Sequence, residues 1–534
     1  MQSTSTLQDH HDYVEAGAAR AGVDPVDPAE ILPEGIRPYV AVPALNPMQV
    51  GAIPLVLEGD RNVVVAAPTG SGKTLVAEVA LLRECRERGR AGVYLAPMRA
   101  IAAEKRDDWQ RLEGLGLRVY KTTGEDDAFD EALALAADII VSTPEKWDSI
   151  GRRALAPALV ARIGAIVMDE VHLVDEGQRG AGQEAMLARI PRLFPGARIV
   201  AMSGTLANAG AIARWLDAAL YESRWRPIAL TKRIVPYRPV GQWEQDEEAR
   251  TRIAATIARD VVAAEGATLV FCGSRKGVER CALALARSLG LSAPARQHSV
   301  GSAPLRQALA GGVAFHHAGL AREDRSAAEQ AFRSGGVKVL VATSTVAAGV
   351  NLPARAVVVR DLQLGTSDLS ASGLLQMAGR AGRPGLETEG YCYVVAPEKD
   401  VDRVKGMLGG SPVGSRLGDD LATHINTEIA LGLVTSRADV AAWYARTLHR
   451  HVAPRPADLD KPLRFLIDEG FVTKEGEALR PTALGKATSD LMIRVASATA
   501  LERYIAAEHK GTADPNTLED RDPGRRLRPA RRAG

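Results

Sequence analysis

Short apolar runs alternate with helical patterns over most of this chain. The runs are rich in valine and isoleucine, and the stretches between them carry apolar residues at helical spacing. The first series is NVVVAA, GVYLAP, DIIVSTP, AIVMDE and RIVAMSG, and the second is ATLVFCGSR, GVAFHHAG, VKVLVATS, AVVVRD and GYCYVVAP. This alternation predicts βαβ units with parallel strands.

Two changes in the pattern divide the chain. Near Leu230 the sequence becomes rich in proline and arginine (TKRIVPYRPVGQW), as in a linker. After about Gly414 the strand-like runs stop, and Leu421, Ile425 and Ile429 fall on one face of a predicted helix. We therefore expect an α/β protein with two tandem parallel sheets followed by a helical region.

The first predicted strand runs into a glycine-rich loop. Gly70 and Gly72 permit a tight turn before Lys73 and Thr74. The pattern G-x-x-x-x-G-K-[ST] is met except at Ala67. In such loops backbone N–H groups and the lysine bind phosphates, and the hydroxyl binds Mg²⁺. We predict a nucleoside triphosphate site, and an ordinary strand-to-helix turn is the alternative. Its residues are Ala67, Pro68, Thr69, Gly70, Ser71, Gly72, Lys73 and Thr74.

Two further stretches carry charges suited to phosphate hydrolysis. AIVMDEVH ends a predicted strand with Asp169, which can hold Mg²⁺, and Glu170, which can orient or deprotonate water. Much later, QMAGRAGRPG places Arg380 and Arg383 about one helical turn apart, where both can meet γ-phosphate charge. These arginines reach the loop only if the second sheet docks against the first. Taken singly, each stretch is also compatible with a solvated charged turn.

The composition restricts the partners and the cellular compartment that we expect for this protein. The net charge is +2 at pH 7, so binding of nucleic acid has to come from local grooves rather than a global basic field. The four cysteines are scattered without a C-x-x-C pair, as in a reduced cytosolic protein. The chain contains no apolar stretch near ~18 residues and no signal-peptide pattern at its N-terminus. We expect a cytoplasmic protein without a membrane partner.

From roughly Leu45 to Leu491 the chain resembles superfamily 2 helicases of the Ski-like and helicase-Q-like branch. NPMQ resembles the Q motif, APTGSGKT motif I, APMRAIAAEK motif Ia, STPEKWD the next strand-contacting motif and DEVH motif II. SGTLAN stands where the family usually has S-A-T, with Gly204 in place of alanine. FCGSRKGVE resembles motif IV, ATSTVAAGVNLPAR motif V and QMAGRAGRPG motif VI.

The resemblance implies roles for the matching positions. Gln49 would read adenine, Lys73 and Thr74 would hold phosphates and Mg²⁺, Asp169 would organise Mg²⁺, and Glu170 would activate water. The residues expected to contact the nucleotide from the second sheet domain are Gly349, Asn351, Arg380 and Arg383. Those expected to grip the sugar-phosphate backbone are Arg99, Thr143, Pro144, Lys146 and Thr345. Those expected to couple the ATP site to strand movement are His172, Ser203, Thr205 and Gln376.

The resemblance also implies a domain plan. It comprises an N-terminal segment (1–40), RecA-like domain 1 with the ATP site (41–228), RecA-like domain 2 (229–413), a winged-helix domain (414–492), and a partial ratchet helix with an arginine-rich tail (493–534). Family members continue into a long helical ratchet domain, whereas this chain ends at Gly534. DLQLGTSDLSASGLL, between motifs V and VI, is expected to form a strand-separating hairpin with 365–368 at its tip.

Three functions compete. The first is an ATP- and Mg²⁺-dependent helicase or translocase, 3′ to 5′ on single-stranded or tailed nucleic acid, with DNA favoured over RNA. The second is an RNA helicase or ribonucleoprotein remodeller, since contacts to the phosphate backbone carry no base information and only a 2′-hydroxyl contact distinguishes RNA. The third is a truncated module that clamps a strand and needs a protein partner to supply the ratchet function. The intact Lys73, Asp169, Glu170 and arginine pair argue against it.

Overall fold

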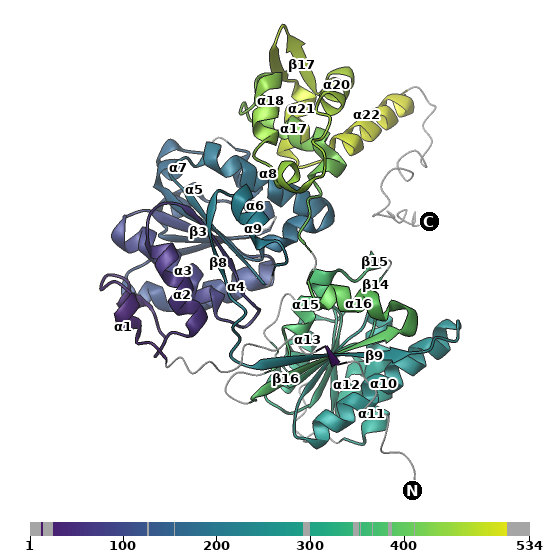
Figure 1. Cartoon of the computed structure of the whole chain (residues 1–534). Helices are drawn as coiled ribbons and strands as arrows, with labels where there is room; N and C mark the ends of the chain where they lie inside the picture. Colours follow the sequence, from purple (N-terminus) through teal and green to yellow (C-terminus); the bar gives the residue numbers. More distant parts are fainter. Residues whose placement is uncertain are drawn as a thin grey trace.

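The computed structural model describes residues 12–13, 25–124, 128–153, 155–204, 206–291, 300–344, 352, 354–365, 367–382, 387–410 and 412–509. Two bodies, each built on a parallel sheet, lie next to one another, and a helical body sits on the first (Figure 1). The expected α/β class with two tandem RecA-like sheets and a helical C-terminal region is confirmed. Within the described part, no helix combines the length and apolar character needed to cross a bilayer.

The first sheet has the strand order β4-β5-β3-β6-β7-β2-β8, and all its pairings are parallel. Its central strands are buried along their lengths, which fits their continuous Val and Ile runs. The strands are β2 (Asn62–Ala66), β3 (Ala91–Leu95), β4 (Val119–Thr122), β5 (Ile139–Ser142), β6 (Ile163–Met168), β7 (Arg198–Ser203) and β8 (Ala218–Glu222). Strands β6, β7 and β2 are neighbours, so the segments that follow them meet at one edge.

Helices cover both faces of this sheet. They are α1 (Pro28–Ile31), α2 (Pro47–Leu57), α3 (Lys73–Glu87), α4 (Arg99–Asp108), α5 (Glu131–Ala136), α6 (Pro144–Gly151), α7 (Pro157–Arg162), α8 (Gly177–Leu193) and α9 (Ala209–Trp215), with 3-10 turns η1 (Arg37–Tyr39), η2 (Trp109–Leu115) and η3 (Val171–Asp175). Leu32, Ile36 and Tyr39 pack into the core beneath α2 and α3, ahead of the boundary expected at residue 41.

The second sheet has the strand order β1-β9-β16-β13-β10-β12-β11. Its strands are β1 (Asp12–Tyr13), β9 (Ala229–Tyr237), β10 (Thr268–Phe271), β11 (Val313–His316), β12 (Val339–Ala342), β13 (Ala356–Val359) and β16 (Glu389–Pro397). All pairings are parallel except that of β1. Residues 12–13 of the expected N-terminal segment therefore add an edge strand to the second sheet.

Helices α10 (Trp243–Ala263), α11 (Arg275–Leu289), α12 (Ala303–Ala310), α13 (Arg322–Arg333), α15 (Ala371–Ala378) and α16 (Val401–Leu408), with the 3-10 turn η4 (Glu398–Asp400), surround this sheet. A short antiparallel hairpin, β14 (Gln363–Leu364) and β15 (Ser367–Asp368), follows β13. The hairpin lies where the sequence predicted one. Ser367 and Asp368 belong to its second strand rather than to its turn.

The helical body consists of short helices and one antiparallel hairpin. It contains η5 (Leu417–Asp420), α17 (Leu421–Ala430), α18 (Arg437–Tyr444), α19 (Leu448–Val452), α20 (Asp460–Asp468), the hairpin β17 (Val472–Glu475) and β18 (Ala478–Pro481), α21 (Ala483–Asp490) and α22 (Val495–His509). Leu421, Ile425 and Ile429 are buried together in its core, as their helical spacing predicted. The domain limits proposed from the sequence stay a proposal.

Buried charges join this body to the first sheet domain. Arg189 of α8 donates to Glu428 of α17 (Nε to Oε1, 2.7 Å) and to Asp148 of α6 (Nη1 to Oδ1, 2.5 Å), and all three side chains are buried. Arg152, directly after α6, pairs with Asp148 and donates to the Ser489 carbonyl. Removing any one partner would leave an uncompensated buried charge, so the network ties the two bodies together.

Apart from residues 14–24 between β1 and α1, which lie outside the described residues, the chain crosses between the two sheet domains twice (Figure 1). It first leaves β8 and enters β9. It returns after α16, and the returning segment is fixed to the first domain because Val413 exchanges two hydrogen bonds with the side chain of Asn208 (2.8 and 2.9 Å).

Candidate active site

The glycine-rich loop joins β2 to α3, as its sequence predicted. Gly70 and Gly72 have φ of +83° and +90°, in the left-handed region that side chains disfavour. The Lys73 ammonium is buried and donates to the carbonyl oxygens of Ala67 (2.7 Å) and Pro68 (3.1 Å). Burial lowers the pKa of Lys73, while the Glu170 and Asp169 carboxylates oppose that effect. The loop thus holds one cation at the N-terminus of a helix, facing two acids.

Gln49 of the expected Q motif lies against this loop. Its side-chain oxygen accepts from the Asn46 backbone N–H (3.0 Å), and the Asn46 side chain accepts from the Gln49 N–H (3.0 Å), which caps α2. The Gln49 amide also donates to the Gly72 carbonyl (3.2 Å), and a Cβ on Gly72 would approach it to 2.5 Å. Gln49 therefore supports the loop in this state. Its contact with adenine stays a prediction, for which the amide has one further N–H and one further lone pair.

Asp169 and Glu170 follow β6 at the edge where the loop lies. Asp169 is held by the Tyr94 hydroxyl (2.6 Å) and by the Glu170 backbone N–H (3.0 Å). Burial raises the pKa of Asp169 to about 6, and the neighbouring Glu170 carboxylate adds to the rise. Glu170 has a φ of +53°, a strained conformation for a residue with a side chain. Such strain is typical of sites where a side chain must be held in one direction.

His172 connects this acidic pair to the second sheet domain. Its Nδ1 lies 2.8 Å from Oγ of Ser203, the last residue of β7, and 3.3 Å from Glu170 Oε2. Its Nε2 lies 3.0 Å from the amide nitrogen of Gln376 on α15. Because an amide nitrogen only donates, Nε2 accepts and the ring proton sits on Nδ1. Three of the expected coupling residues are thus in direct contact.

Arg380 enters the same cleft from the end of α15. Burial lowers the pKa of its guanidinium, and the Glu104 and Glu170 carboxylates oppose that effect, so Arg380 faces the acids of the first domain. Arg226, in the first crossing between the domains, donates to the carbonyls of Gly379 and Ala381 (both 3.4 Å). Its charge also acts on Lys73. The two sheets therefore dock, as the arginine assignment required.

Two residues of this site were missed by the sequence reasoning. Tyr94 occupies a position in an apolar strand, and nothing in the pattern GVYLAP distinguishes its hydroxyl from a core position. Arg226 lies just ahead of TKRIVPYRPVGQW, which was interpreted as a linker but contains most of strand β9, and the arginines of SRWRP were a signal that was not used. The predicted residues Thr205, Thr345, Gly349, Asn351 and Arg383 lie outside the described residues.

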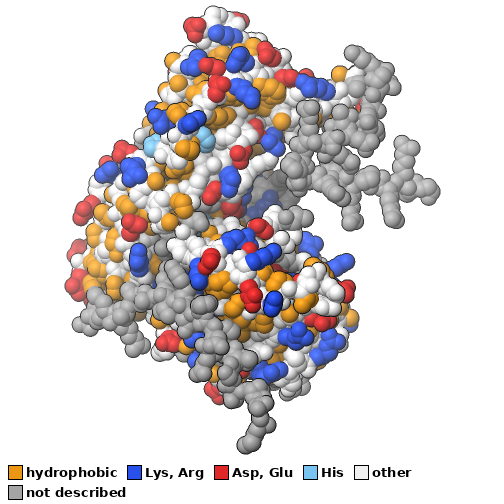
Figure 2. Space-filling view, turned by 45° about the vertical axis from the view of Figure 1, so that its right-hand side comes forward, with side chains coloured by type: hydrophobic (Ala, Val, Ile, Leu, Met, Phe, Trp, Pro, Cys, Tyr) orange, Lys and Arg blue, Asp and Glu red, His pale blue; other side chains and the backbone are white. Residues whose placement is uncertain are grey.

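A second group of predicted residues gathers at the carboxyl ends of β3 and β5. Thr143 caps α6, with its hydroxyl accepting from the Lys146 N–H (3.4 Å), and Pro144 opens that helix. The Lys146 ammonium donates to the Gly124 carbonyl (2.9 Å), and the Arg99 guanidinium packs against the same glycine. Four of the five expected strand-binding residues are therefore neighbours. On the face in Figure 2, Lys and Arg side chains are interspersed with Asp and Glu, without one large basic field.

The donor set suits a magnesium ion that is bound together with a nucleotide. Among the described residues no group of three or more His, Cys, Asp or Glu side chains could cage a metal. Mg²⁺ usually takes one or two protein carboxylates and fills its shell with phosphate oxygens and water. Asp169 and the Thr74 hydroxyl fit that requirement, and the ion would neutralise phosphate charge during transfer.

Comparisons with known proteins agree with this geometry. Residues 46–212 match the DEAD/DEAH box helicase family, and residues 254–385 match the helicase conserved C-terminal domain. A curated relative from Thermoplasma acidophilum, named ATP-dependent DNA helicase Hel308, is 37% identical over 462 residues, which cover 83% of this chain and 67% of the relative. Proteins of the same name from Methanocella arvoryzae and Pyrococcus horikoshii are 34% and 32% identical, covering 90% and 89% of this chain and 70% and 68% of theirs. The chain is a superfamily 2 helicase and belongs to the Hel308 family.

Proposed function

We propose that the chain is an ATP-dependent DNA helicase that hydrolyses ATP between its two sheet domains and moves 3′ to 5′ along one strand. The contact of His172 with Gln376 carries this proposal. It joins the acids that would act on ATP to a helix of the other domain, so a change at the phosphates alters how the domains dock. The polarity rests on the resemblance to the Ski-like and helicase-Q-like branch.

In this mechanism Lys73 neutralises charge on the β and γ phosphates, and Glu170 orients the attacking water and takes its proton. Arg380 approaches the γ-phosphate from the second domain, and such an arginine contributes on the order of 10³–10⁵ in rate. Loss of the phosphate removes the anion that draws Arg380 towards Lys73. The cleft then relaxes, and one domain shifts along the strand.

DNA is the favoured strand. The relatives carry the name ATP-dependent DNA helicase. The group of Arg99, Thr143 and Lys146 offers a guanidinium, a helix N-terminus and an ammonium. These suit phosphate oxygens and carry no sequence information.

The test is the steady-state ATPase rate without nucleic acid, with single-stranded DNA and with RNA of matched sequence, using Lys73→Ala as the blank. Stimulation by DNA followed by unwinding of a 3′-tailed but not a 5′-tailed duplex supports the proposal. Stimulation by RNA alone would favour a remodeller of RNA. If the basal ATPase rate exceeds that of Lys73→Ala but neither DNA nor RNA stimulates it, the result would favour a module that requires a protein partner.

A further inference from the structure

A second cavity lies in the second sheet domain, apart from the residues of the candidate ATP site. Its volume is about 380 Å³, and it opens where β10, β13 and β16 end. Gln363, Gly365 and Asp368 of the β14–β15 hairpin form part of its wall. Ligand pockets typically enclose about 300–1,000 Å³, so this cavity is large enough for a small aromatic group.

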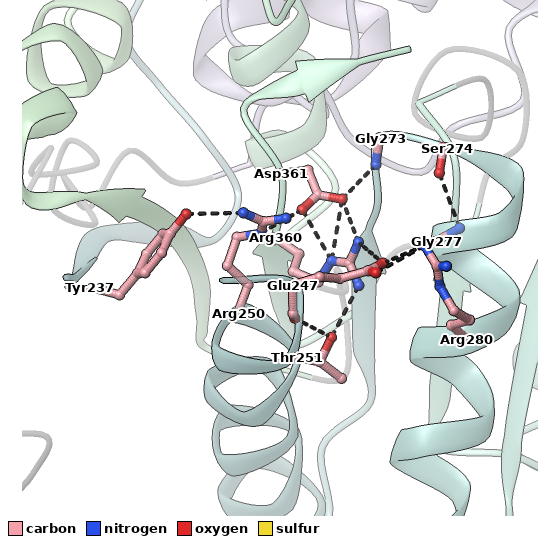
Figure 3. A network of polar contacts seen from close by, with 10 residues as sticks. All are labelled: Tyr237, Glu247, Arg250, Thr251, Gly273, Ser274, Gly277, Arg280, Arg360 and Asp361. Atoms are coloured by element: carbon pink, nitrogen blue, oxygen red, sulfur yellow. Dashed lines mark hydrogen bonds and ion pairs between the residues drawn. The ribbon is translucent and has the colours of Figure 1, made fainter. Parts of the chain in front are cut away.

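The floor of the cavity is a fixed network of charges (Figure 3). Arg360 is only 2% exposed and donates to Asp361 (Nη2 to Oδ2, 2.6 Å) and to Thr251 (3.1 Å). Asp361 also accepts from the Gly273 N–H (2.8 Å) and pairs with Arg250 (3.0 Å). Helix α10 and the ends of β10 and β13 are thereby held together, and the cavity is already formed without a ligand.

The rim carries an exposed aromatic ring and an exposed cation. The Trp243 side chain is 59% exposed at the start of α10, an unusual position for so large an apolar group. The Arg280 guanidinium lies over its ring, 4.8 Å from the centroid, and pairs with Glu247 (2.8 Å), which orients the indole. Lys399 lies at the same rim, exposed, and has no ion-pair partner among the residues that the structure describes.

The charge balance indicates what kind of ligand fits. Cationic and anionic side chains line the cavity in equal number, so a free polyanion gains little there. A nucleobase is uncharged, presents both donors and acceptors at its edge, and stacks on indole and guanidinium planes. Its phosphate would remain outside, where Lys399 can meet it. A single nucleotide of a strand satisfies all of these features.

We propose that this cavity receives an unpaired nucleotide beside the β14–β15 hairpin, where the duplex opens. Trp243 would stack on the base and Lys399 would contact its phosphate. The inference rests on the proposed helicase function and adds a binding site for the strand at the point of separation. The captured nucleotide belongs either to the displaced strand or to the strand on which the protein moves.

The experiment uses the full chain and a forked DNA with a photoreactive thymidine analogue at the first unpaired position of either arm. Crosslinked peptides are mapped, and the affinities for the fork and for single-stranded DNA are compared. Trp243→Ala should lower the fork-to-single-strand affinity ratio about tenfold, the size expected for loss of one stacked base, and Trp243→Phe should restore most of it. Lys399→Ala should lower the same ratio and leave the fold intact, because the side chain is exposed.

Val240→Ala is the matched control, since Val240 is 63% exposed, lies close to Trp243 in sequence and does not line the cavity. It should keep wild-type crosslinking and affinity. Crosslinks at the cavity from one arm support the proposal and identify the strand. Crosslinks from neither arm, or an unchanged affinity ratio in both Trp243→Ala and Lys399→Ala, overturn it. The proposed function is judged separately, because it fails only if single-stranded DNA does not stimulate the wild-type ATPase.

Discussion

His172 and Gln376 are in contact across the cleft between the two sheet domains, with their Nε2 atoms 3.0 Å apart. The other ring nitrogen of His172 faces Ser203 and Glu170. One imidazole therefore joins the acid that would activate water to a helix of the opposite domain. Any change in the position of Glu170 alters a bond on which the docking of the domains depends.

Gln376→Ala should uncouple hydrolysis from strand binding. Loss of one hydrogen bond to His172 is worth about 1–1.5 kcal/mol, so stimulation of the ATPase by single-stranded DNA should fall about tenfold. Steady-state rates with and without DNA measure the effect. Ser372→Ala is the control, because Ser372 lies one turn earlier on the same helix and its hydroxyl bonds Ser370 (3.1 Å) rather than His172. Equal stimulation in Gln376→Ala and wild type would mean that the contact is incidental to coupling.

Glu170→Gln should retain ATP binding and lose turnover. The amide keeps the shape of the side chain but cannot take a proton from water, and loss of a general base costs about 10²–10⁴ in rate. Nucleotide affinity and single-turnover hydrolysis separate the two effects. Lys73→Ala, by comparison, should lose affinity for ATP. A Glu170→Gln variant that hydrolyses ATP at the wild-type rate would remove Glu170 from its role.

Arg99→Ala should weaken binding of single-stranded DNA and flatten its salt dependence. Each phosphate bound on a single strand contributes about 0.7 to the slope of log affinity against log salt concentration, so removal of the Arg99 guanidinium should lower the slope by that amount. Titrations over a range of salt concentrations measure it. Arg106 lies on the same helix and is already paired with Glu113 (3.0 Å), so Arg106→Ala is the control. An unchanged slope for Arg99→Ala would place the strand elsewhere.

Glu184 should make folding stability depend on pH at the junction of α8 with the helical body. Burial raises the pKa of Glu184 from 4.5 to about 7, although Ser415 Oγ (2.5 Å) and the His449 N–H (2.8 Å) donate to it. The folded state therefore binds its proton more tightly than the unfolded state. The protonated acid stabilises the fold fully below about pH 4.5, and that contribution is lost as the pH rises through 7.

The free energy of unfolding should fall by on the order of 3 kcal/mol between pH 4.5 and about 7, the two pKa values of Glu184 in the unfolded and folded states. Glu184→Gln cannot ionise and should flatten the profile of stability against pH over that range. Urea unfolding of both proteins at several pH values, with hydrogen exchange in α8, measures this. A wild-type profile that rises from pH 5 to 8, or one that Glu184→Gln leaves unchanged, would contradict the assignment.

The sequence predicts the two sheets and the acidic edge because both depend on local pattern. Valine-rich runs form the buried strands, and Asp169 and Lys73 follow β6 and β2, which lie on either side of β7 and end at the same edge of the sheet. From the sequence, docking of the two sheet domains could be stated only as a requirement. Arg380 can reach the ATP site only if the second sheet domain lies against the first. In the structure, the docking of the domains depends on contacts such as that of His172 with Gln376, two positions that are 204 residues apart in the sequence.

The cavity beside the hairpin is a feature that the sequence does not reveal. AVVVRD predicts a strand, and nothing in that run shows that Arg360 is buried and bonded to groups on α10, over 100 residues earlier in the chain. The acceptors that permit its burial become neighbours only after the sheet forms. Likewise β1, which spans only Asp12–Tyr13, has too little pattern of its own to predict pairing with β9.

Two of the connections between the sheet domains, from β8 to β9 and from α16 to Val413, restrict their relative motion. Each short connection holds a point of one domain near a point of the other, so the domains can rotate past these points more easily than they can separate there. Because Asn208 holds Val413 with two hydrogen bonds, the second connection keeps its place on the first domain. In the proposed cycle, the relative motion of the two sheet domains would therefore be mainly a rotation.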